Sequence, residues 1–319
     1  MASSRNSPCT DPLDASLQAL LDALAKDARL SVGFSGGLDS TVLLHLAARH
    51  LGRERLSAIH VHHGLSPQAD AWAESCAAVC AELGVPLQVV PVSVPRDSPE
   101  GLEAAARRLR YAAFARCAAD HVLLAHHADD QAETLLFNLL RGAGVRGAAG
   151  MQTTHAGGRY LRPLLGSPRS ELERYARVHG LRWIEDESNS DTAFARNYIR
   201  HAVMPVMVRR FPAAGDTLAR AAEHFAEAQE MLDEMACHDL GSCTDFPVPV
   251  EILSGLTSAR ARNALRYLLA LHGLQAPSGR RLQEVLRQFI EAAPDRHPRV
   301  ELPGYRLFRA RGRIELELR

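Results

Sequence analysis

Six consecutive residues, Ser35 to Ser40, have the types and the spacing that suit the binding of a phosphate chain. They read Ser-Gly-Gly-Leu-Asp-Ser and stand between the apolar run Leu30–Phe34 and a second apolar run that favours a helix. Two adjacent glycines let backbone amides approach a ligand closely, because no Cβ stands in the way. Amides that converge at a helix N-terminus bind anions, and the helix dipole adds to this. We therefore predict a phosphate-binding loop that consists of Ser35, Gly36, Gly37, Leu38, Asp39 and Ser40.

An ordinary strand–turn–helix connection is the alternative for this loop. The two glycines alone would fit that alternative equally well, since glycine is common in turns. The whole pattern SGGxDS between a strand and a helix favours the phosphate site instead. The pattern is not the GxxxxGK[ST] loop, and no lysine follows it.

A second polar string, HHADDQAET from His126 to Thr134, stands where another predicted strand gives way to a helix. Asp129 and Asp130 fall in the first helical turn, where the dipole favours carboxylates. Asp130 and Glu133 are three residues apart and therefore project from one face of that helix. Two anions that face a cleft need a cation between them, so we expect Mg²⁺ or an amino group there.

Two alternatives apply to this second string. The paired histidines and aspartates suggest a transition-metal site, but their spacing matches none of the usual zinc patterns. Helix capping by Asp129 alone would explain one carboxylate and leave Asp130 and Glu133 in solvent. The complete string disfavours that interpretation.

Both polar strings, Ser35–Ser40 and His126–Thr134, follow predicted strands. These strands alternate with predicted helices of roughly 10–17 residues. The predicted strands are Leu30–Phe34, Leu56–His62, Leu87–Val92 and His121–Ala125. This alternation indicates an α/β fold, a Rossmann-like parallel sheet with helices on both faces. Ligands bind at the carboxyl ends of the strands in such sheets. We therefore expect three loops to meet, namely Ser35–Ser40, His62–Gly64 and His126–Asp130.

The length of 319 residues fits two domains. We predict a disordered lead over residues 1–15, a catalytic α/β domain over 16–211, and a smaller, mainly α-helical domain over 216–319 that ends in a small hairpin. Phe211–Gly215 would link the two domains. A basic helix over Asn197–Arg210 would close the first domain.

The N-terminal residues contain no apolar signal core, and no run reaches the roughly 18 apolar residues of a membrane span. The six cysteines include no CxxC pair and suit reduced thiols. We therefore predict a cytoplasmic protein without a membrane partner.

Charge gives a weaker indication of the partner. The net charge is zero, but arginines outnumber acidic residues between Arg141 and Arg220, and this excess would suit a phosphate backbone. Lys26 is the only lysine. A coding bias toward arginine explains the low ratio of lysine to arginine. It does not explain why arginines cluster between Arg141 and Arg220.

Six strings of the sequence occur in the order found in one enzyme family. They are SGGLDS, HVHHGLS, AHHADDQAET, LLRGAGVRGAAGM, RPLL and WIEDESNSDTAFARNYIRHAVMP. Over Leu30 to Arg210 the chain thus resembles the bacterial tRNA(Ile)-lysidine synthases, which are PP-loop ATP pyrophosphatases. The last two strings distinguish this family from other PP-loop enzymes.

The resemblance implies a ligase that forms a carbon–nitrogen bond. Such an enzyme joins L-lysine to the 2-position of the wobble cytidine in the isoleucine tRNA with a CAU anticodon, by way of an adenylated cytidine. It consumes ATP, releases diphosphate and AMP, and changes codon reading from AUG to AUA. Asp39 would hold Mg²⁺ beside the phosphates of ATP.

The resemblance also suggests residues for the other two substrates. Free lysine would be bound by His126, Asp130 and Glu133, and either His126 or His127 would take a proton from its amine. The tRNA would be bound by basic and amide side chains, which are Arg141, Arg146, Arg196, Asn197 and Arg200.

Three positions depart from the family pattern. His62 stands where the family usually has asparagine, Ser66 stands where it has arginine, and Gly101 replaces an asparagine. These departures affect the second and third strand loops rather than the ATP loop. The chain resembles a shorter form without the extra C-terminal domain of longer members, and a homodimer is left open.

Other protein classes remain as alternatives. tRNA sulfur-transferases need a catalytic cysteine pair or an iron–sulfur site, which Cys76, Cys80 and Cys117 do not supply convincingly. GMP and asparagine synthetases need a glutamine-amidotransferase domain, and the sequence contains no such stretch. A non-catalytic ATP sensor would have no reason to keep the string DDQAET beside a basic helix.

Overall fold

A computed structural model of the chain describes residues 11–99, 101–155, 157–186, 191–192, 194–293 and 295–319. The chain divides into two compact units, 1–226 and 227–319. Within the described ranges, none of the helices combines the length and the apolar character needed to cross a membrane. The first ten residues of the predicted disordered lead lie outside the described residues. The remainder of that lead was wrongly assigned, because helix α1 already begins at Pro12.

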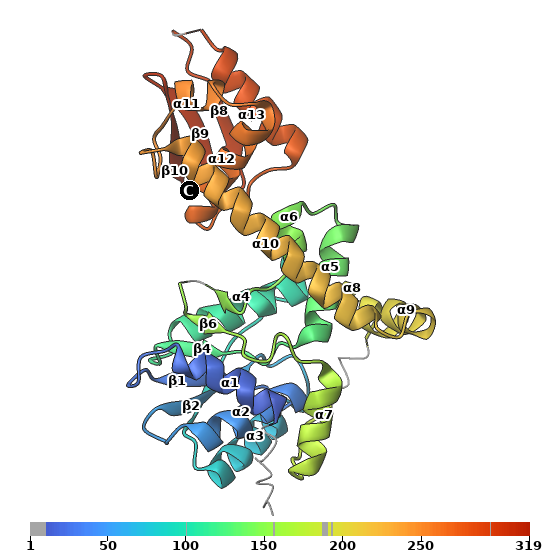
Figure 1. Cartoon of the computed structure of the whole chain (residues 1–319). Helices are drawn as coiled ribbons and strands as arrows, with labels where there is room; N and C mark the ends of the chain where they lie inside the picture. The colour runs from blue at the N-terminus through green and yellow to red at the C-terminus, as the bar shows by residue number, and fades with distance from the viewer. Residues whose placement is uncertain (1–10, 100, 156, 187–190, 193, 294) are drawn as a thin grey trace, which may run out of the picture. The chain divides into compact units, whose positions relative to one another are not determined.

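The first unit contains a six-stranded sheet in the order β3-β2-β1-β4-β6-β5. Figure 1 labels β1, β2, β4 and β6 of this sheet. Strands β1, β2, β3, β4 and β6 are parallel, and β5 pairs antiparallel at the edge. This arrangement confirms the predicted α/β class. The strands span Leu30–Gly33 (β1), Leu56–His62 (β2), Leu87–Pro91 (β3), His121–Leu123 (β4), Thr154–His155 (β5) and Tyr160–Leu161 (β6).

Both faces of this sheet are covered, because successive side chains of a strand point to opposite sides. On one face, Leu56 and Ala58 of β2 pack in a core with residues of α1, α2, α3 and α7. On the other face, Ile59 packs with Phe114 of α4. The helices span Pro12–Asp22 (α1), Leu38–His50 (α2), Ala69–Leu83 (α3), Leu102–Ala115 (α4), Ala128–Leu140 (α5), Val145–Ala148 (α6) and Arg169–Val178 (α7).

The predicted basic helix Asn197–Arg210 is three consecutive segments in the structure. The α-helix Ala195–Tyr198 (α8) is followed by a π-helical turn, Ile199–Val203, and then by the α-helix Met204–Arg210 (α9). Buried Ile199 and Met204 pack on Ala132 of α5. The segment is therefore docked on the helix that carries the acidic string.

The second unit has a core of its own. Helix α13 (Gly279–Glu291) buries Leu282, Val285, Leu286 and Phe289, the spacing of one helical face. The other elements of this unit are α11 (Val250–Ser254), α12 (Ser258–Leu271) and four antiparallel strands in the order β7-β10-β9-β8. These strands span Val248–Pro249 (β7), Arg299–Leu302 (β8), Tyr305–Ala310 (β9) and Arg313–Leu318 (β10).

Two features of the predicted domain organisation differ in the structure. The C-terminal hairpin is larger, because β8 adds to the β9–β10 pair and β7 adds at the opposite edge. The two units meet at Ala226 and Glu227, within the long helix α10 (Ala214–Leu240). The expected linker Phe211–Gly215 therefore lies inside the first unit, where α9 ends and α10 begins.

Acid is expected to weaken the packing of α7 on α2. His45 Nδ1 lies 2.9 Å from the hydroxyl of fully buried Tyr175, and its ring lies 5.1 Å from that of His179. Burial, then the charge of His179, lowers the pKa of His45 below 6.5. A lowered histidine pKa contributes stability above the unfolded-state pKa, and that contribution is lost as the pH falls below it.

The melting temperature of the wild type should therefore fall more between about pH 7.5 and pH 5.5 than that of His45→Gln. Thermal unfolding at the two pH values measures this difference. His224→Gln, at an exposed position of α10, is the matched control and should behave like the wild type. Equal losses in His45→Gln and the wild type would contradict the assignment.

Candidate active site

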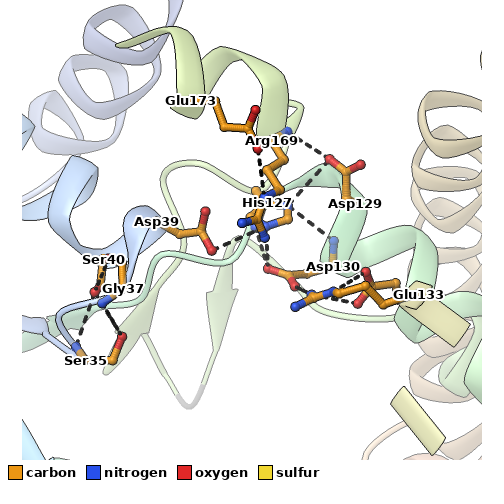
Figure 2. A network of polar contacts seen from close by, with 11 residues as sticks. Ser35, Gly37, Asp39, Ser40, His127, Asp129, Asp130, Glu133, Arg169 and Glu173 are labelled. Atoms are coloured by element: carbon orange, nitrogen blue, oxygen red, sulfur yellow. Dashed lines mark hydrogen bonds and ion pairs between the residues drawn. The ribbon is translucent and has the colours of Figure 1, made fainter. Parts of the chain in front are cut away.

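The predicted phosphate loop connects β1 to α2, and Gly37 is the residue that caps this helix. The Ser35 amide donates to Ser40 Oγ at 3.2 Å, and the two hydroxyl oxygens lie 3.0 Å apart. The Gly37 amide donates to Ser35 Oγ at 3.3 Å (Figure 2). Thr41 closes the turn by donating to the Gly37 carbonyl at 3.0 Å. The loop is thus preformed at a helix N-terminus, as an anion site requires.

Gly36 holds the loop against the rest of the unit. Its φ is +85°, a conformation that L side chains rarely adopt. Its carbonyl accepts a 2.9 Å hydrogen bond from the Ile184 amide. A Cβ at Gly36 would lie 2.6 Å from Ile184 Cδ1 and 2.9 Å from Cys76 Sγ. This contact was not predicted from the sequence, because Ile184 lies far from the loop in the sequence.

Gly36→Ala is expected to lower the free energy of unfolding by about 2 kcal/mol and to weaken ATP binding, since the new methyl group forces both a strained backbone and a displaced Ile184. Thermal unfolding and nucleotide titration measure the two effects. Gly37→Ala is the matched control for stability, because its φ is −72° and its added Cβ meets nothing closer than 3.5 Å. Equal melting temperatures for the two variants would contradict this account.

His127 lies at the centre of the polar network in Figure 2. It is 1% exposed and caps α5, where its amide donates to Asp130 Oδ2 at 3.1 Å. Its ring nitrogens lie 3.6 Å from Asp39, 3.6 Å from Asp129 and 3.4 Å from Asp130. The histidine therefore joins the phosphate loop to the acidic string. The predicted meeting of Ser35–Ser40 with His126–Asp130 takes place through this side chain.

The carboxylates determine the charge of His127. Burial opposes the imidazolium, but Asp129, Asp39 and Asp130 outweigh burial and raise the pKa of His127 to about 10. A competing contact, in which the Asp130 amide donates to His127 Nδ1, is long at 3.4 Å and too weak to keep the ring neutral. His127 is thus a cation that neutralises part of the surrounding negative charge.

Asp129 has a structural role in addition. Its Oδ2 accepts the backbone amide of Arg169 at 2.8 Å and so satisfies a free amide at the start of α7. The ion pair with His127, at 3.6 Å, is the main cause that lowers the pKa of Asp129 to about 2. The capping alternative considered for this residue is therefore partly right, although the helix it caps is α7 rather than α5.

Asp130 and Glu133 project from one face of α5, as their spacing predicts, and the cation between them is Arg200. Its Nε donates to Glu133 Oε1 at 2.7 Å and its Nη2 donates to Glu133 Oε2 at 2.8 Å. The same Nη2 donates to Asp130 Oδ1 at 2.7 Å. Burial raises the pKa of Glu133, and Arg200 opposes that rise. Arg200 was expected on a tRNA-facing surface, and the structure instead directs it into the acidic pair.

His126 has a different environment from its neighbour. Its Nδ1 accepts a hydrogen bond of 3.3 Å from Arg162 Nε. Burial is the main cause that lowers its pKa to about 3, although Asp130 opposes the change. His126 is therefore neutral at physiological pH and a weak proton acceptor. Because His127 is already protonated, neither histidine is well suited to the base role that sequence reasoning offered them.

The predicted loop His62–Gly64, which follows β2, has contacts different from those of the other two loops. His62 Nε2 pairs with Asp70 at 2.9 Å, and His60 Nδ1 lies 2.9 Å from the Phe34 carbonyl. His63 and Gly64 line a cavity of about 440 Å³ together with the end of β3 and the residues that follow it. This cavity lies at the carboxyl edge of the sheet, where the loop His62–Gly64 was expected.

Asp39 fits the predicted role of a magnesium ligand. Its Oδ1 is buried and lacks a hydrogen-bond partner among the described residues. Such an oxygen is suited to a hard cation. The described part of the chain contains no group of three His, Cys, Asp or Glu residues that could hold a metal by itself. Mg²⁺ commonly takes one or two carboxylates plus the phosphates of a substrate, which matches a single aspartate in a phosphate loop.

The remaining residues predicted for tRNA lie near the C-terminal half of α5. Arg141 stacks 5.0 Å from the centre of the Phe137 ring, and exposed Arg146 lies on α6. Arg196 Nη2 donates to Thr134 Oγ1 at 2.6 Å, and Asn197 Nδ2 donates to the Asp191 carbonyl at 3.0 Å. A largely apolar pocket of about 390 Å³ is lined by Phe137, Leu140, Arg141, Thr192, Ala195, Tyr198 and Ile199.

The cysteines described in the first unit do not form a reactive pair. Cys76 and Cys80 are buried, and burial raises the pKa of their thiols to about 12 and about 11. Cys76 Sγ lies 3.5 Å from His60 Nδ1, behind the phosphate loop. These two thiols therefore pack the core and are poor nucleophiles.

A phosphate loop of this sequence between the first strand of a parallel sheet and a helix defines a PP-loop protein. Residues 10–207 match the family model of the PP-loop domain. The U34-tRNA thiolase NcsA from Methanococcus maripaludis, solved with its [4Fe-4S] cluster, has the same fold. The TM-score is 0.55 at 19% identity, over 67% of this chain and 78% of the thiolase.

A match to a second family model identifies the family within the PP-loop class. Residues 249–315 match the TilS substrate binding domain. The tRNA(Ile)-lysidine synthase of Nitrosomonas europaea is 42% identical over 99% of this chain and 70% of its own length. The chain belongs to the tRNA(Ile)-lysidine synthase family. The enzyme of Alkalilimnicola ehrlichii is 50% identical over 89% of this chain, and the chain spans 65% of that relative's length.

Proposed function

We propose that the protein is a tRNA(Ile)-lysidine synthase that joins L-lysine to the 2-position of the wobble cytidine in the isoleucine tRNA with a CAU anticodon. The observation that carries this proposal is the position of His127. It lies 3.6 Å from Asp39 of the phosphate loop and 3.4 Å from Asp130 of the acidic pair. A site for ATP and a site for an amine thus adjoin, as a reaction with an activation step and an amine transfer requires.

The activation step uses the phosphate loop. The 2-carbonyl oxygen of cytosine attacks the α-phosphate of ATP, the bond between the α- and β-phosphates breaks, and diphosphate leaves. The loop amides and the hydroxyls of Ser35 and Ser40 hold the phosphates in place. Asp39 would hold Mg²⁺, which neutralises negative charge on the phosphates when bound. Charge stabilisation of this kind is the main requirement of phosphoryl and nucleotidyl transfer.

The second step uses the acidic pair. The side-chain amine of lysine attacks C2 of the adenylated cytidine, a carbon–nitrogen bond forms, and AMP leaves. Asp130 and Glu133 bind the lysine side chain as a cation, with His126 beside them. The ammonium must lose one proton before the amine can attack, because free lysine is protonated at neutral pH. Glu133 suits proton acceptance better than either histidine, since burial raises its pKa.

The tRNA contacts lie on the surface around the C-terminal half of α5. Arg141 lines the apolar pocket, Arg146 lies on α6, and Arg196 and Asn197 lie on α8 between the lining residues Ala195 and Tyr198. Guanidinium groups attract phosphates, and an apolar pocket with aromatic walls suits an unstacked base. The match of residues 249–315 to a substrate binding domain supports a further contribution from the second unit. A tRNA substrate places the protein in the cytoplasm.

Bulk tRNA, ATP and labelled lysine, followed by alkaline deacylation, test the proposal. We expect label that survives alkali, because lysine is attached to a base rather than through an aminoacyl ester. Omission of ATP should abolish the label. Complete loss of label after alkali would contradict the proposal.

A further inference from the structure

Arg200 already fills the position that the proposed function gives to the lysine side chain. Its guanidinium makes three hydrogen bonds of 2.7–2.8 Å to the two carboxylates, two of them in a bidentate pair with Glu133. The Glu133 side chain is 5% exposed and that of Asp130 is 17% exposed. Bidentate, charge-assisted contacts in a buried setting are among the strongest polar interactions in proteins. The acidic pair is therefore occupied before any substrate binds.

The acidic pair has room for one cation in the geometry described. Both oxygens of Glu133 and Oδ1 of Asp130 bind Arg200, while Oδ2 of Asp130 accepts the His127 amide. His127 places a further positive charge beside Asp130. An ammonium group brought to the same oxygens would be repelled by the guanidinium at short range. Free lysine and Arg200 must therefore compete for the pair.

The backbone at Arg200 departs from a regular α-helix. Arg200 belongs to the π-helical turn Ile199–Val203, which interrupts the helix between α8 and α9. Such turns occur frequently at functional sites. Buried Ile199 anchors the turn on Ala132 of α5, whereas the Arg200 side chain is 29% exposed and has a path to solvent. The guanidinium can leave the pair while the helix stays docked.

We propose that Arg200 determines lysine specificity by holding the place of the substrate ammonium between Asp130 and Glu133, and that lysine binds by displacing it. This inference rests on the proposed function. Displacement requires a ligand that replaces the positive charge and brings further contacts of its own. Small amines such as ammonia replace only the charge, so Arg200 excludes them from the second step.

Lysine and n-butylamine are the probes for the test, and isothermal titration measures their dissociation constants. Arg200→Gln should bind lysine about tenfold or more tightly than the wild type, because the competing cation is gone. Arg200→Lys retains a charge but loses the bidentate fork, so its lysine affinity should lie between the two. n-Butylamine should bind measurably only to the variants. Arg177→Gln, an exposed arginine of α7, is the matched control.

Thermal unfolding shows whether each variant is folded, and saturating lysine should raise the melting temperature of Arg200→Gln more than that of the wild type. Arg200→Lys keeps the proposal testable where Arg200→Gln fails to fold. Weaker or unchanged lysine binding in the folded variants would overturn the inference, and would assign Arg200 to a substrate contact. Failure of the wild type to form alkali-stable lysyl-tRNA would overturn the proposed function. Tighter n-butylamine binding by the variants would still support the cation site in that case.

Discussion

Replacement of Asp39 by asparagine is expected to reduce tRNA-dependent release of diphosphate from ATP by about a hundred- to a thousandfold. The asparagine has nearly the same shape, so the change removes charge without removing volume. It removes the carboxylate oxygen that is proposed to hold Mg²⁺, and it removes one of three anions that surround His127. The measurement is a diphosphate assay with ATP, Mg²⁺ and tRNA.

Asp70→Asn provides the matched control for this change. Asp70 lies in the same unit, carries the same charge and is 94% exposed, so its replacement should leave diphosphate release near the wild-type rate. Thermal unfolding should show that Asp39→Asn remains folded. Near-normal diphosphate release by folded Asp39→Asn would exclude the assigned role of Asp39.

Glu133→Gln is expected to separate the two steps of the reaction. Lysine incorporation should fall about a hundredfold or more, because the variant loses the carboxylate that is proposed to bind the amine and take its proton. Diphosphate release should stay within a few-fold of the wild type, since Glu133 does not contact the phosphate loop in the described structure. Asp130 remains to neutralise Arg200. The two rates are measured on the same samples, as diphosphate released and as labelled lysine retained on tRNA.

A control glutamate is available on a different helix. Glu82 is exposed on α3, and Glu82→Gln should leave both rates unchanged. Equal losses of diphosphate release and lysine incorporation in Glu133→Gln would contradict the division of the site into an ATP half and an amine half.

The parts of the fold that follow from local pattern could be predicted from the sequence. The bounds of β2, Leu56–His62, were predicted correctly, because apolar residues make up most of this short segment and Gly64 follows it. The phosphate loop was located for a similar reason, since two glycines and an aspartate between a strand and a helix are all local. The three-residue spacing of Asp130 and Glu133 also placed them correctly on one helix face.

The parts that depend on contacts between distant residues could not be predicted. His127 is the centre of the network, yet the sequence does not show that Asp39 lies against it. Arg200 was predicted to bind tRNA, because helical spacing identifies a face of a helix without saying what that face contacts. The π-helical turn that carries Arg200 has no sequence signature of this kind. One signal was available in principle, since an acidic pair that needs a cation implies a basic partner elsewhere in the chain.

The arrangement suggests why activation and amine transfer can share one site. His127 and Arg200 are cations that balance Asp39, Asp129, Asp130 and Glu133 before any ligand binds. A positive charge brought in by a substrate therefore replaces a positive charge of the protein that is already present. This limits the cost of desolvation at each step.

The most direct test of the account uses ATP labelled at the α-phosphate, an isoleucine tRNA transcript with a CAU anticodon, and no lysine. We predict that label becomes attached to this transcript and that later addition of lysine releases it as AMP. A transcript with uridine in place of the wobble cytidine should stay unlabelled. Release of labelled AMP at the same rate with and without tRNA, with no label on the transcript, would contradict the central claim that this PP-loop site adenylates the wobble cytidine.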